Sequence, residues 1–184
     1  MKHIPKVINS RVAYENAHVK CVVDTLSRDG KTWEQAYLAK PIPDIDVSVI
    51  PYENGGVYML RQYRHANRCE LWQFPGGGGE PDASIIESAH RELTEETGFV
   101  AGQMETIGLT YNEAGLVNLK TTILVATDLK KGERRLEHTE VGMEMHFFTI
   151  AEMEMMIEAG EIQCGFALAS WTFFRNYLQQ QNIQ

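Results

Sequence analysis

The sequence predicts an α+β fold, in which a mixed sheet is combined with a few helices. Three observations predict it. Most segments with regular apolar patterning have the alternation and the β-rich composition of strands. Only three segments have the apolar spacing of a helix. No internal repeat or low-complexity linker divides the 184 residues, of which 43% are apolar, so one domain with a small terminal extension is expected.

The first part of the chain is predicted to form strands. Residues 18–27 are rich in β-forming side chains, and the sequence Arg28-Asp29-Gly30 is typical of a hairpin turn leading into residues 31–40. Prolines at positions 41 and 43 then interrupt the chain. Residues 1–45 are therefore expected to form a separate antiparallel β-layer or a dimerisation arm.

The rest of the chain, residues 46–184, is predicted to form the main domain. Strands at 46–53 and 56–64 are expected to pair as a hairpin around Asn54-Gly55-Gly56, and a short strand at 71–75 leads into four consecutive glycines. Later strands and helices are expected in this order: strands at 104–112, 119–129 and 142–149, then helices at 150–160 and 167–181.

A helix is predicted from Ser84 to Thr97. Ser84 and Glu87 have the spacing of a capping box, and Gly98 is typical of the residue that ends a helix. The apolar residues that recur at helical spacing are Ile85, Ile86, Ala89 and Leu93.

Composition excludes some partners and indicates a compartment. The net charge is −8 without a basic block, which argues against non-specific binding to nucleic acid or to an anionic membrane. The three cysteines match no zinc or redox spacing and favour free thiols in a reducing cytosol. The first ten residues lack the apolar core of a signal peptide, and no apolar run approaches the ~18 residues of a membrane span. The sequence thus indicates a soluble cytoplasmic protein.

Three carboxylates are crowded on the predicted helix. Glu92 and Glu96 share one face with Glu95 alongside, at the edge of the apolar stripe instead of opposite it. Such a cluster repels itself unless a positive charge joins it. Arg91, four residues before Glu95, is one candidate, and a hard divalent cation such as Mg²⁺ is the other.

The glycine run supplies a complementary feature. Backbone N–H groups at a helix N-terminus bind anions, and glycine lets a backbone carbonyl turn toward a metal. A metal, a phosphate site and a carboxylate base together suffice for attack of water on phosphorus. Taken singly, the hexapeptide RELTEE is common on surface helices and a glycine run is common in turns. Their joint spacing favours the functional interpretation.

The stretch from Pro75 to Phe99 resembles the Nudix box, Gx5Ex7REUxEExGU, in which U is a bulky apolar residue. Ala83 departs from this pattern, because the first motif glutamate falls there, and Glu80 or Asp82 is the nearest substitute. The positions that match are Gly77, Arg91, Glu92, Leu93, Glu95, Glu96, Gly98 and Phe99.

The resemblance implies a Nudix α/β/α sandwich with a mixed sheet, and hydrolysis of a nucleoside diphosphate derivative to two monophosphates. It implies that Glu92, Glu95 and Glu96 bind Mg²⁺, or alternatively Mn²⁺, with the carbonyl of Gly76. Arg91 would orient the glutamates. Beside them, the backbone of Gly77 and Gly78 would lie next to substrate phosphate.

The segment RQYR, residues 61–64, is similar to ADP-ribose pyrophosphatases and nucleotide-sugar hydrolases. In that subgroup the arginine at the position of Arg64 reaches substrate phosphate, and a distal glutamate acts as catalytic base or as an extra metal ligand. Glu140 is the first choice for this glutamate and Glu137 the second. Members of the subgroup are usually homodimers with exchanged N-terminal regions, so an ADP-ribose-like or nucleotide-sugar substrate and a homodimer are expected.

Two further activities remain open. Ala114 stands where the subgroup has a proline, and WQFPGG also resembles hydrolases of dinucleoside polyphosphates and RNA 5′ ends. In such an enzyme Trp72 is a candidate for stacking on a base. Ala83 also leaves open a weakly active, nucleotide-binding Nudix module.

Overall fold

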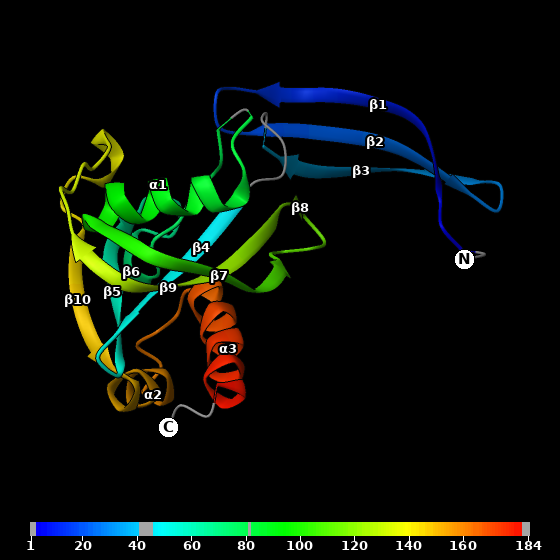
Figure 1. Cartoon of the computed structure of the whole chain (residues 1–184). Helices are drawn as coiled ribbons and strands as arrows, with labels where there is room; N and C mark the ends of the chain where they lie inside the picture. Colours follow the sequence, from blue (N-terminus) through cyan, green and yellow to red (C-terminus); the bar gives the residue numbers. More distant parts are fainter. Residues whose placement is uncertain (1–2, 41–45, 81, 182–184) are drawn as a thin grey trace. The chain divides into compact units, whose positions relative to one another are not determined.

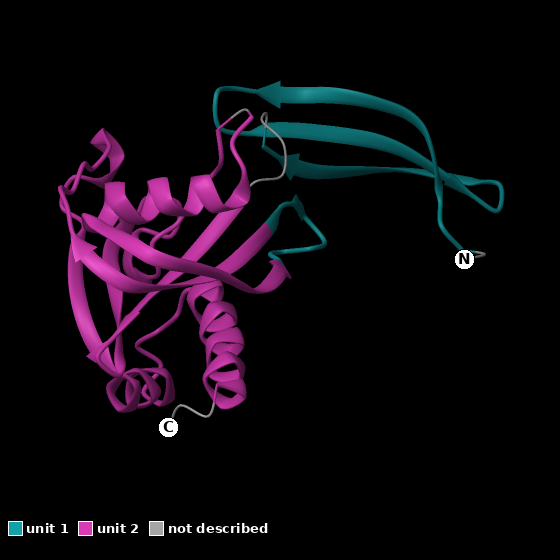
Figure 2. Cartoon of the chain, viewed as in Figure 1, with its two compact units in different colours: residues 1–44, 111–120 teal, residues 45–110, 121–184 magenta. Residues whose placement is uncertain are grey.

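The computed structural model describes residues 3–40, 46–80 and 82–181. The chain forms two compact units (Figure 2). Unit 1 comprises residues 1–44 and 111–120, and unit 2 comprises residues 45–110 and 121–184. The segment 111–120 therefore joins the N-terminal strands, although it follows them by some seventy residues in the sequence. The prolines at 41 and 43, predicted to interrupt the chain, lie outside the described residues.

Unit 1 is a sheet of four strands. Their order is β1-β2-β3-β8, antiparallel except that β8 runs parallel to β3. The predicted hairpin turn is present, with φ of 51° at Asp29 and 75° at Gly30. The strands are β1 (Lys6–Glu15), β2 (Lys20–Arg28), β3 (Lys31–Ala39) and β8 (Val117–Asn118).

Strand β1 is missing from the sequence prediction. Its pairing with β2 shifts register between Val7 and Asn9 and again between Val12 and Tyr14. Each irregularity breaks the period-two alternation that identifies a strand, and every residue of β1 is exposed. The apolar pattern of β1 therefore carries little strand signal.

Unit 2 is built on a mixed sheet with the order β10-β5-β4-β9-β7, in which β6 also pairs with β5 (Figure 1). The central pair β4 and β9 is parallel, and β5 pairs antiparallel with β4, β6 and β10. The strands are β4 (Asp46–Glu53), β5 (Gly56–Arg64), β6 (Cys69–Gln73), β7 (Phe99–Tyr111), β9 (Lys120–Lys131) and β10 (Glu144–Thr149).

In the described residues of unit 2, three helices and one 3-10 turn accompany the sheet, and helices cover both of its faces (Figure 1). Successive residues of β9 alternate between the faces: Leu124 packs in the cluster with α1, and Ile123 packs in the cluster with α3. The elements are α1 (Ile85–Thr97), the 3-10 turn η1 (His138–Glu140), α2 (Ile150–Glu158) and α3 (Gly165–Gln180).

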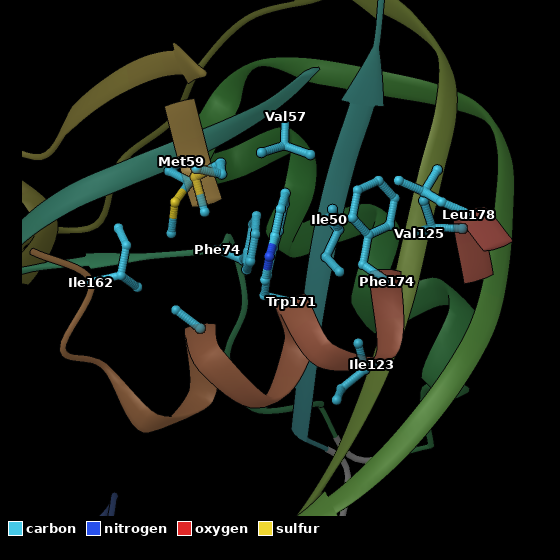
Figure 3. Close-up of a cluster of buried hydrophobic side chains, with 12 residues drawn as sticks. Ile50, Val57, Met59, Phe74, Ile123, Val125, Ile162, Trp171, Phe174 and Leu178 are labelled. Atoms are coloured by element: carbon cyan, nitrogen blue, oxygen red, sulfur yellow. The ribbon is translucent and has the colours of Figure 1, made fainter. Parts of the chain in front are cut away.

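The two faces carry separate cores. On one face, Ala89 and Leu93 of α1 are fully buried against β4 and β9. On the other face, Trp171 and Phe174 of α3 point into a cluster with Val57 (Figure 3). These two layers fix α1 on a rigid sheet, which is what a site on α1 requires. Among the described helices, none is long and apolar enough to cross a membrane.

The predicted start and end of α1 are confirmed. The Ser84 hydroxyl accepts a hydrogen bond from the Glu87 backbone N–H at 3.2 Å, and the Glu87 carboxylate accepts one from the Ser84 N–H at 2.8 Å. Gly98 ends the helix in the left-handed region, with φ of 76°. Strands β4 and β5 also have the predicted bounds.

Candidate active site

The glycine run is held against strand β4 by backbone hydrogen bonds. The Val49 N–H donates to the Pro75 carbonyl at 2.8 Å, and the Val47 N–H donates to the Gly77 carbonyl at 2.9 Å. A Cβ atom at Gly76 would lie 2.1 Å from the Val47 carbonyl oxygen. Glycine is therefore required at position 76, because a side chain would separate the loop from the sheet.

The loop also meets the carboxylates of α1 directly. The Gly76 N–H donates to Glu96 Oε2 at 2.7 Å. A Cβ atom at Gly77 would lie 2.6 Å from Glu92 Oε1, so any other residue would displace the Glu92 carboxylate from this position. The predicted association between the glycine run and the acidic helix is thus a direct contact in the structure.

Two of the three glutamates are almost fully buried. Glu92 is 7% exposed and Glu96 is 3% exposed. Burial raises the pKa of Glu96 to about 9; the Gly76 N–H and the charge of Arg64 lower it, and Glu92 and Glu140 raise it. Burial likewise raises the pKa of Glu92 to about 7, against the opposing effect of Arg91. Burial therefore disfavours ionisation of both carboxylates, most strongly for Glu96, and an added positive charge would favour their ionised forms.

Arg91 connects the glutamates to the glycine loop. Its guanidinium donates to Glu95 at 2.7 Å, to Glu92 at 2.8 Å and to the Gly78 carbonyl at 2.7 Å. A fourth, longer contact of 3.8 Å pairs it with Glu80. Of the two residues suggested as substitutes for the missing glutamate at position 83, Glu80 forms an ion pair with Arg91; that it takes the place of the motif glutamate stays a prediction.

Arg64 and Glu140 lie near the same pair of glutamates. Arg64, at the end of β5, acts electrostatically on Glu96, and Glu140, on η1, acts on both Glu92 and Glu96. Glu140 Oε2 accepts a hydrogen bond from the backbone N–H of Glu137 at 2.9 Å, so Glu137 contributes its backbone to the turn that carries Glu140. Arg64 and Glu140, the arginine and the distal glutamate that the sequence predicted, therefore both lie close to the glutamates of α1.

Trp72 packs beside strand β10. Its ring meets His146 at 5.2 Å and Phe148 at 5.1 Å between centroids, edge to face in both cases, and Arg61 lies over it at 5.8 Å. These contacts account for a tryptophan at this position without a bound base.

The donor set suits a hard divalent cation. Within the described ranges, no group of three or more His, Cys, Asp or Glu side chains is already arranged to hold a metal. Glu92 and Glu96 nevertheless offer buried carboxylate oxygens whose ionisation is unfavourable without an added positive charge, and hard cations prefer such oxygen ligands. The residues therefore fit a divalent ion chemically.

Two functional candidates are missing from the sequence prediction, Gln62 and Gln73. Both are buried, and both belong to hydrogen bonds that reach Arg64 or η1. The only signal for Gln62 is its position between Arg61 and Tyr63 in alternating strand β5, which turns a polar side chain inward. Gln73 has no comparable signal, because β6 is too short to define a face.

The mixed sheet lies between helices, and the glycine loop contacts the acidic helix, as in the class of fold that the box motif predicts. Residues 43–163 match the NUDIX domain, and the chain belongs to that family. The family prediction is confirmed. A solved structure described as the crystal structure of an ADP compounds hydrolase superposes with a TM-score of 0.85 at 20% identity, covering 100% of this chain and 99% of that one. The predicted sandwich fold is confirmed by this likeness.

Curated relatives match part of the chain. The ADP-ribose pyrophosphatase of Mycobacterium tuberculosis is 32% identical over 122 residues, which cover 64% of this chain and 58% of that protein. The RNA pyrophosphohydrolase of Xanthomonas campestris pv. campestris (strain B100) is 37% identical over 68 residues, covering 37% and 31%. The chain thus spans less than two thirds of the length of the curated relatives that it matches.

Proposed function

We propose that the chain hydrolyses the diphosphate linkage of a nucleoside diphosphate derivative, ADP-ribose-like or a nucleotide sugar, to two monophosphates. The observation that carries this proposal is the contact of two buried glutamates, Glu92 and Glu96, with the backbone of the glycine loop. This contact brings phosphate-binding backbone and metal-binding carboxylates to one place. The similarity to an ADP-ribose pyrophosphatase and to an ADP compounds hydrolase supports the substrate class.

In this proposal, Glu92, Glu95, Glu96 and the Gly76 carbonyl hold the divalent cation, with Mg²⁺ the preferred ion and Mn²⁺ an alternative. When bound, the ion neutralises the diphosphate and lowers the pKa of water. Arg91 orients Glu92 and Glu95 through its hydrogen bonds.

The remaining roles belong to the substrate and to the attacking water. Arg64 and the backbone of Gly77 and Gly78 bind the phosphates. Glu140 takes a proton from the water as its oxygen attacks one phosphorus. The bridging P–O bond of the anhydride then breaks, and the second phosphate leaves with the bond's electron pair.

The test is hydrolysis of ADP-ribose by the purified chain with Mg²⁺. We expect AMP and ribose 5-phosphate, identified by mass. Glu96→Gln should abolish turnover while circular dichroism shows a retained fold, because the buried amide cannot replace the anionic ligand. The matched control, Glu158→Gln, changes an exposed glutamate at the end of α2 and should leave turnover unchanged. Full turnover by Glu96→Gln would exclude the proposed metal site.

The RNA pyrophosphohydrolase similarity favours a second candidate, attack on RNA 5′ ends or dinucleoside polyphosphates. Release of pyrophosphate from 5′-triphosphorylated RNA, faster than cleavage of ADP-ribose, would favour it. Binding of ADP-ribose without product would favour the weakly active nucleotide-binding module.

A cytoplasmic location is also proposed, because Cys21, Cys69 and Cys164 are free thiols.

A further inference from the structure

Two buried glutamines lie beside the candidate site. Gln62, on β5, is 7% exposed, and Gln73, at the end of β6, is 4% exposed. The two strands are antiparallel neighbours, and Gln73 pairs with Leu60, two residues before Gln62. Burying a primary amide costs free energy unless its oxygen and nitrogen find partners. The hydrogen-bond partners of the two glutamines therefore indicate why buried amides stand at these positions.

The hydrogen bonds of the pair have one consistent direction. Gln73 Oε1 accepts from Arg64 Nε at 2.9 Å and also from Arg64 Nη2. A guanidinium only donates, so the amide oxygen of Gln73 must face Arg64. Gln73 Nε2 then donates to Gln62 Oε1 at 3.0 Å. This leaves Gln62 Nε2 to donate to the Thr139 carbonyl at 3.4 Å.

One end of this chain of hydrogen bonds is Arg64, which acts electrostatically on Glu96, and the other end is Thr139. Arg64 is otherwise an exposed side chain at a strand end, and a long side chain there loses much rotational freedom when it is held in one place. Thr139 is the middle residue of η1, the turn that carries Glu140. The two glutamines thus connect Arg64, proposed to bind phosphate, and the turn that carries Glu140, the proposed base, to strands β5 and β6.

We propose that Gln73 and Gln62 are positioning residues that act as a directional relay: Gln73 holds the Arg64 guanidinium, and Gln62 holds the turn that carries Glu140. The inference rests on the proposed function for the roles of Arg64 and Glu140. Gln73 acts on substrate affinity through Arg64, and Gln62 acts on turnover through Glu140. The two variants should therefore separate KM from kcat.

Leucine and glutamate at position 73 should have different effects. Gln73→Leu removes the acceptor of Arg64, and we expect KM to rise about tenfold, the loss of one charge-assisted hydrogen bond. Gln73→Glu keeps an acceptor for Arg64, so KM should stay close to the wild-type value. A carboxylate has no donor for Gln62, however, so the Gln62 amide turns over and its oxygen faces the Thr139 carbonyl. Turnover by Gln73→Glu should then fall.

Gln62→Leu removes the link to η1 and leaves Arg64 its acceptor. We expect kcat to fall about tenfold with KM changed less than threefold. The matched control is Gln103→Leu, which removes an exposed glutamine bonded to Asp128 at 3.0 Å in the same unit. This control should leave both constants unchanged. Thermal unfolding of each variant identifies any that fail to fold. If Gln73→Leu fails to fold, the kinetics of Gln73→Glu test the role of Gln73.

Measurements on the chain without substrate test the relay independently of the proposed function. NMR of the Arg64 Nε–H should show faster exchange with solvent in Gln73→Leu than in the wild type. Amide hydrogen exchange over residues 138–140 should accelerate in Gln62→Leu and not in Gln103→Leu. If these changes occur in a chain without hydrolytic activity, the relay stands and the proposed function fails. Unchanged exchange at both places would overturn the relay itself.

Discussion

At the scale of single residues, Arg91 pairs with one acidic residue outside the family motif, Glu80, in addition to Glu92 and Glu95. Position 83 is an alanine, and Glu80, three residues earlier, pairs with Arg91 at 3.8 Å. Glu80 is exposed, and exposed ion pairs contribute little, about 0–1 kcal/mol. We therefore expect Glu80 to be at most a weak substitute for a glutamate at position 83.

This comparison yields a prediction for two substitutions. Glu80→Gln should lower kcat/KM two- to fivefold, because an exposed pair contributes about 1 kcal/mol at most. Ala83→Glu should raise kcat/KM and should make the additional Glu80→Gln change silent, because the new glutamate then takes the place of Glu80 beside Arg91. Steady-state kinetics of the two single variants and the double variant measure this coupling. Asp82→Asn serves as the control, since it removes a neighbouring charge at an exposed position. Additive effects in the double variant would contradict the shared role.

The buried glutamates predict how stability depends on pH. Burial raises the pKa of Glu92 to about 7 and of Glu96 to about 9, from an ordinary value of 4.5. Between pH 4.5 and these values the folded chain binds more protons than the unfolded chain. The free energy of unfolding in EDTA should therefore decrease as pH rises through this window, by at most about 1.4 kcal/mol per pH unit for each group.

Thermal unfolding from pH 5 to pH 9 in EDTA tests this dependence. The proposed function has Mg²⁺ bind the ionised carboxylates, so its addition should reduce the loss of Tm at high pH. Glu96→Gln should flatten the dependence, whereas Glu158→Gln should keep it. A Tm in EDTA that rises from pH 6 to pH 9 would contradict the raised pKa values.

At the scale of elements, the loop and the helix impose different demands on neighbouring glycines. At Gly76 the obstacle to a side chain is the backbone of Val47, which cannot move without the sheet. At Gly77 the obstacle is the end of the Glu92 side chain, which can rotate away. Gly76→Ala should thus reduce stability, and Gly77→Ala should mainly reduce metal binding.

Calorimetry and metal titration separate the two glycine variants. We expect Gly76→Ala to lower Tm by several degrees, and Gly77→Ala to keep a Tm close to wild type while its Mg²⁺ affinity falls tenfold or more. Gly165→Ala is the control, because a Cβ atom there would meet nothing within 4 Å. Equal losses of Tm in both loop variants would show that the obstacle at Gly77 is also rigid.

The same scale shows which elements the sequence can predict. Strands β4 and β5 and helix α1 carry their own signals: β-forming side chains on either side of an Asn-Gly turn, a capping box and a terminal glycine. Strand β8 has two residues and η1 has three, so neither has a period to detect. The hydrogen bonds of Gln73 join segments that meet only after folding, and no local pattern encodes them. That Arg91, Glu92 and Glu96 lie together was predictable, because one helix carries all three.

At the scale of the whole molecule, unit 1 presents an unusual edge. Strand β1 is at the end of its sheet, is exposed along all ten residues and pairs with β2 alone among the described strands. Four of its exposed side chains are large and apolar: Val7, Ile8, Val12 and Tyr14. Exposed apolar edge strands are sites of association unless charge or proline protects them. We therefore propose that the chain is a homodimer through the N-terminal unit.

Sedimentation equilibrium tests this proposal directly. The wild-type chain should have twice the monomer mass of 20.9 kDa. A double variant, Ile8→Lys with Val12→Lys, should be monomeric, because two lysines on an edge strand oppose pairing with a second copy. Met155→Lys places the same charge at an exposed apolar residue of α2 and should remain dimeric. A monomeric wild type would exclude the dimer. If Met155→Lys alone were monomeric, the interface would involve α2 instead of β1.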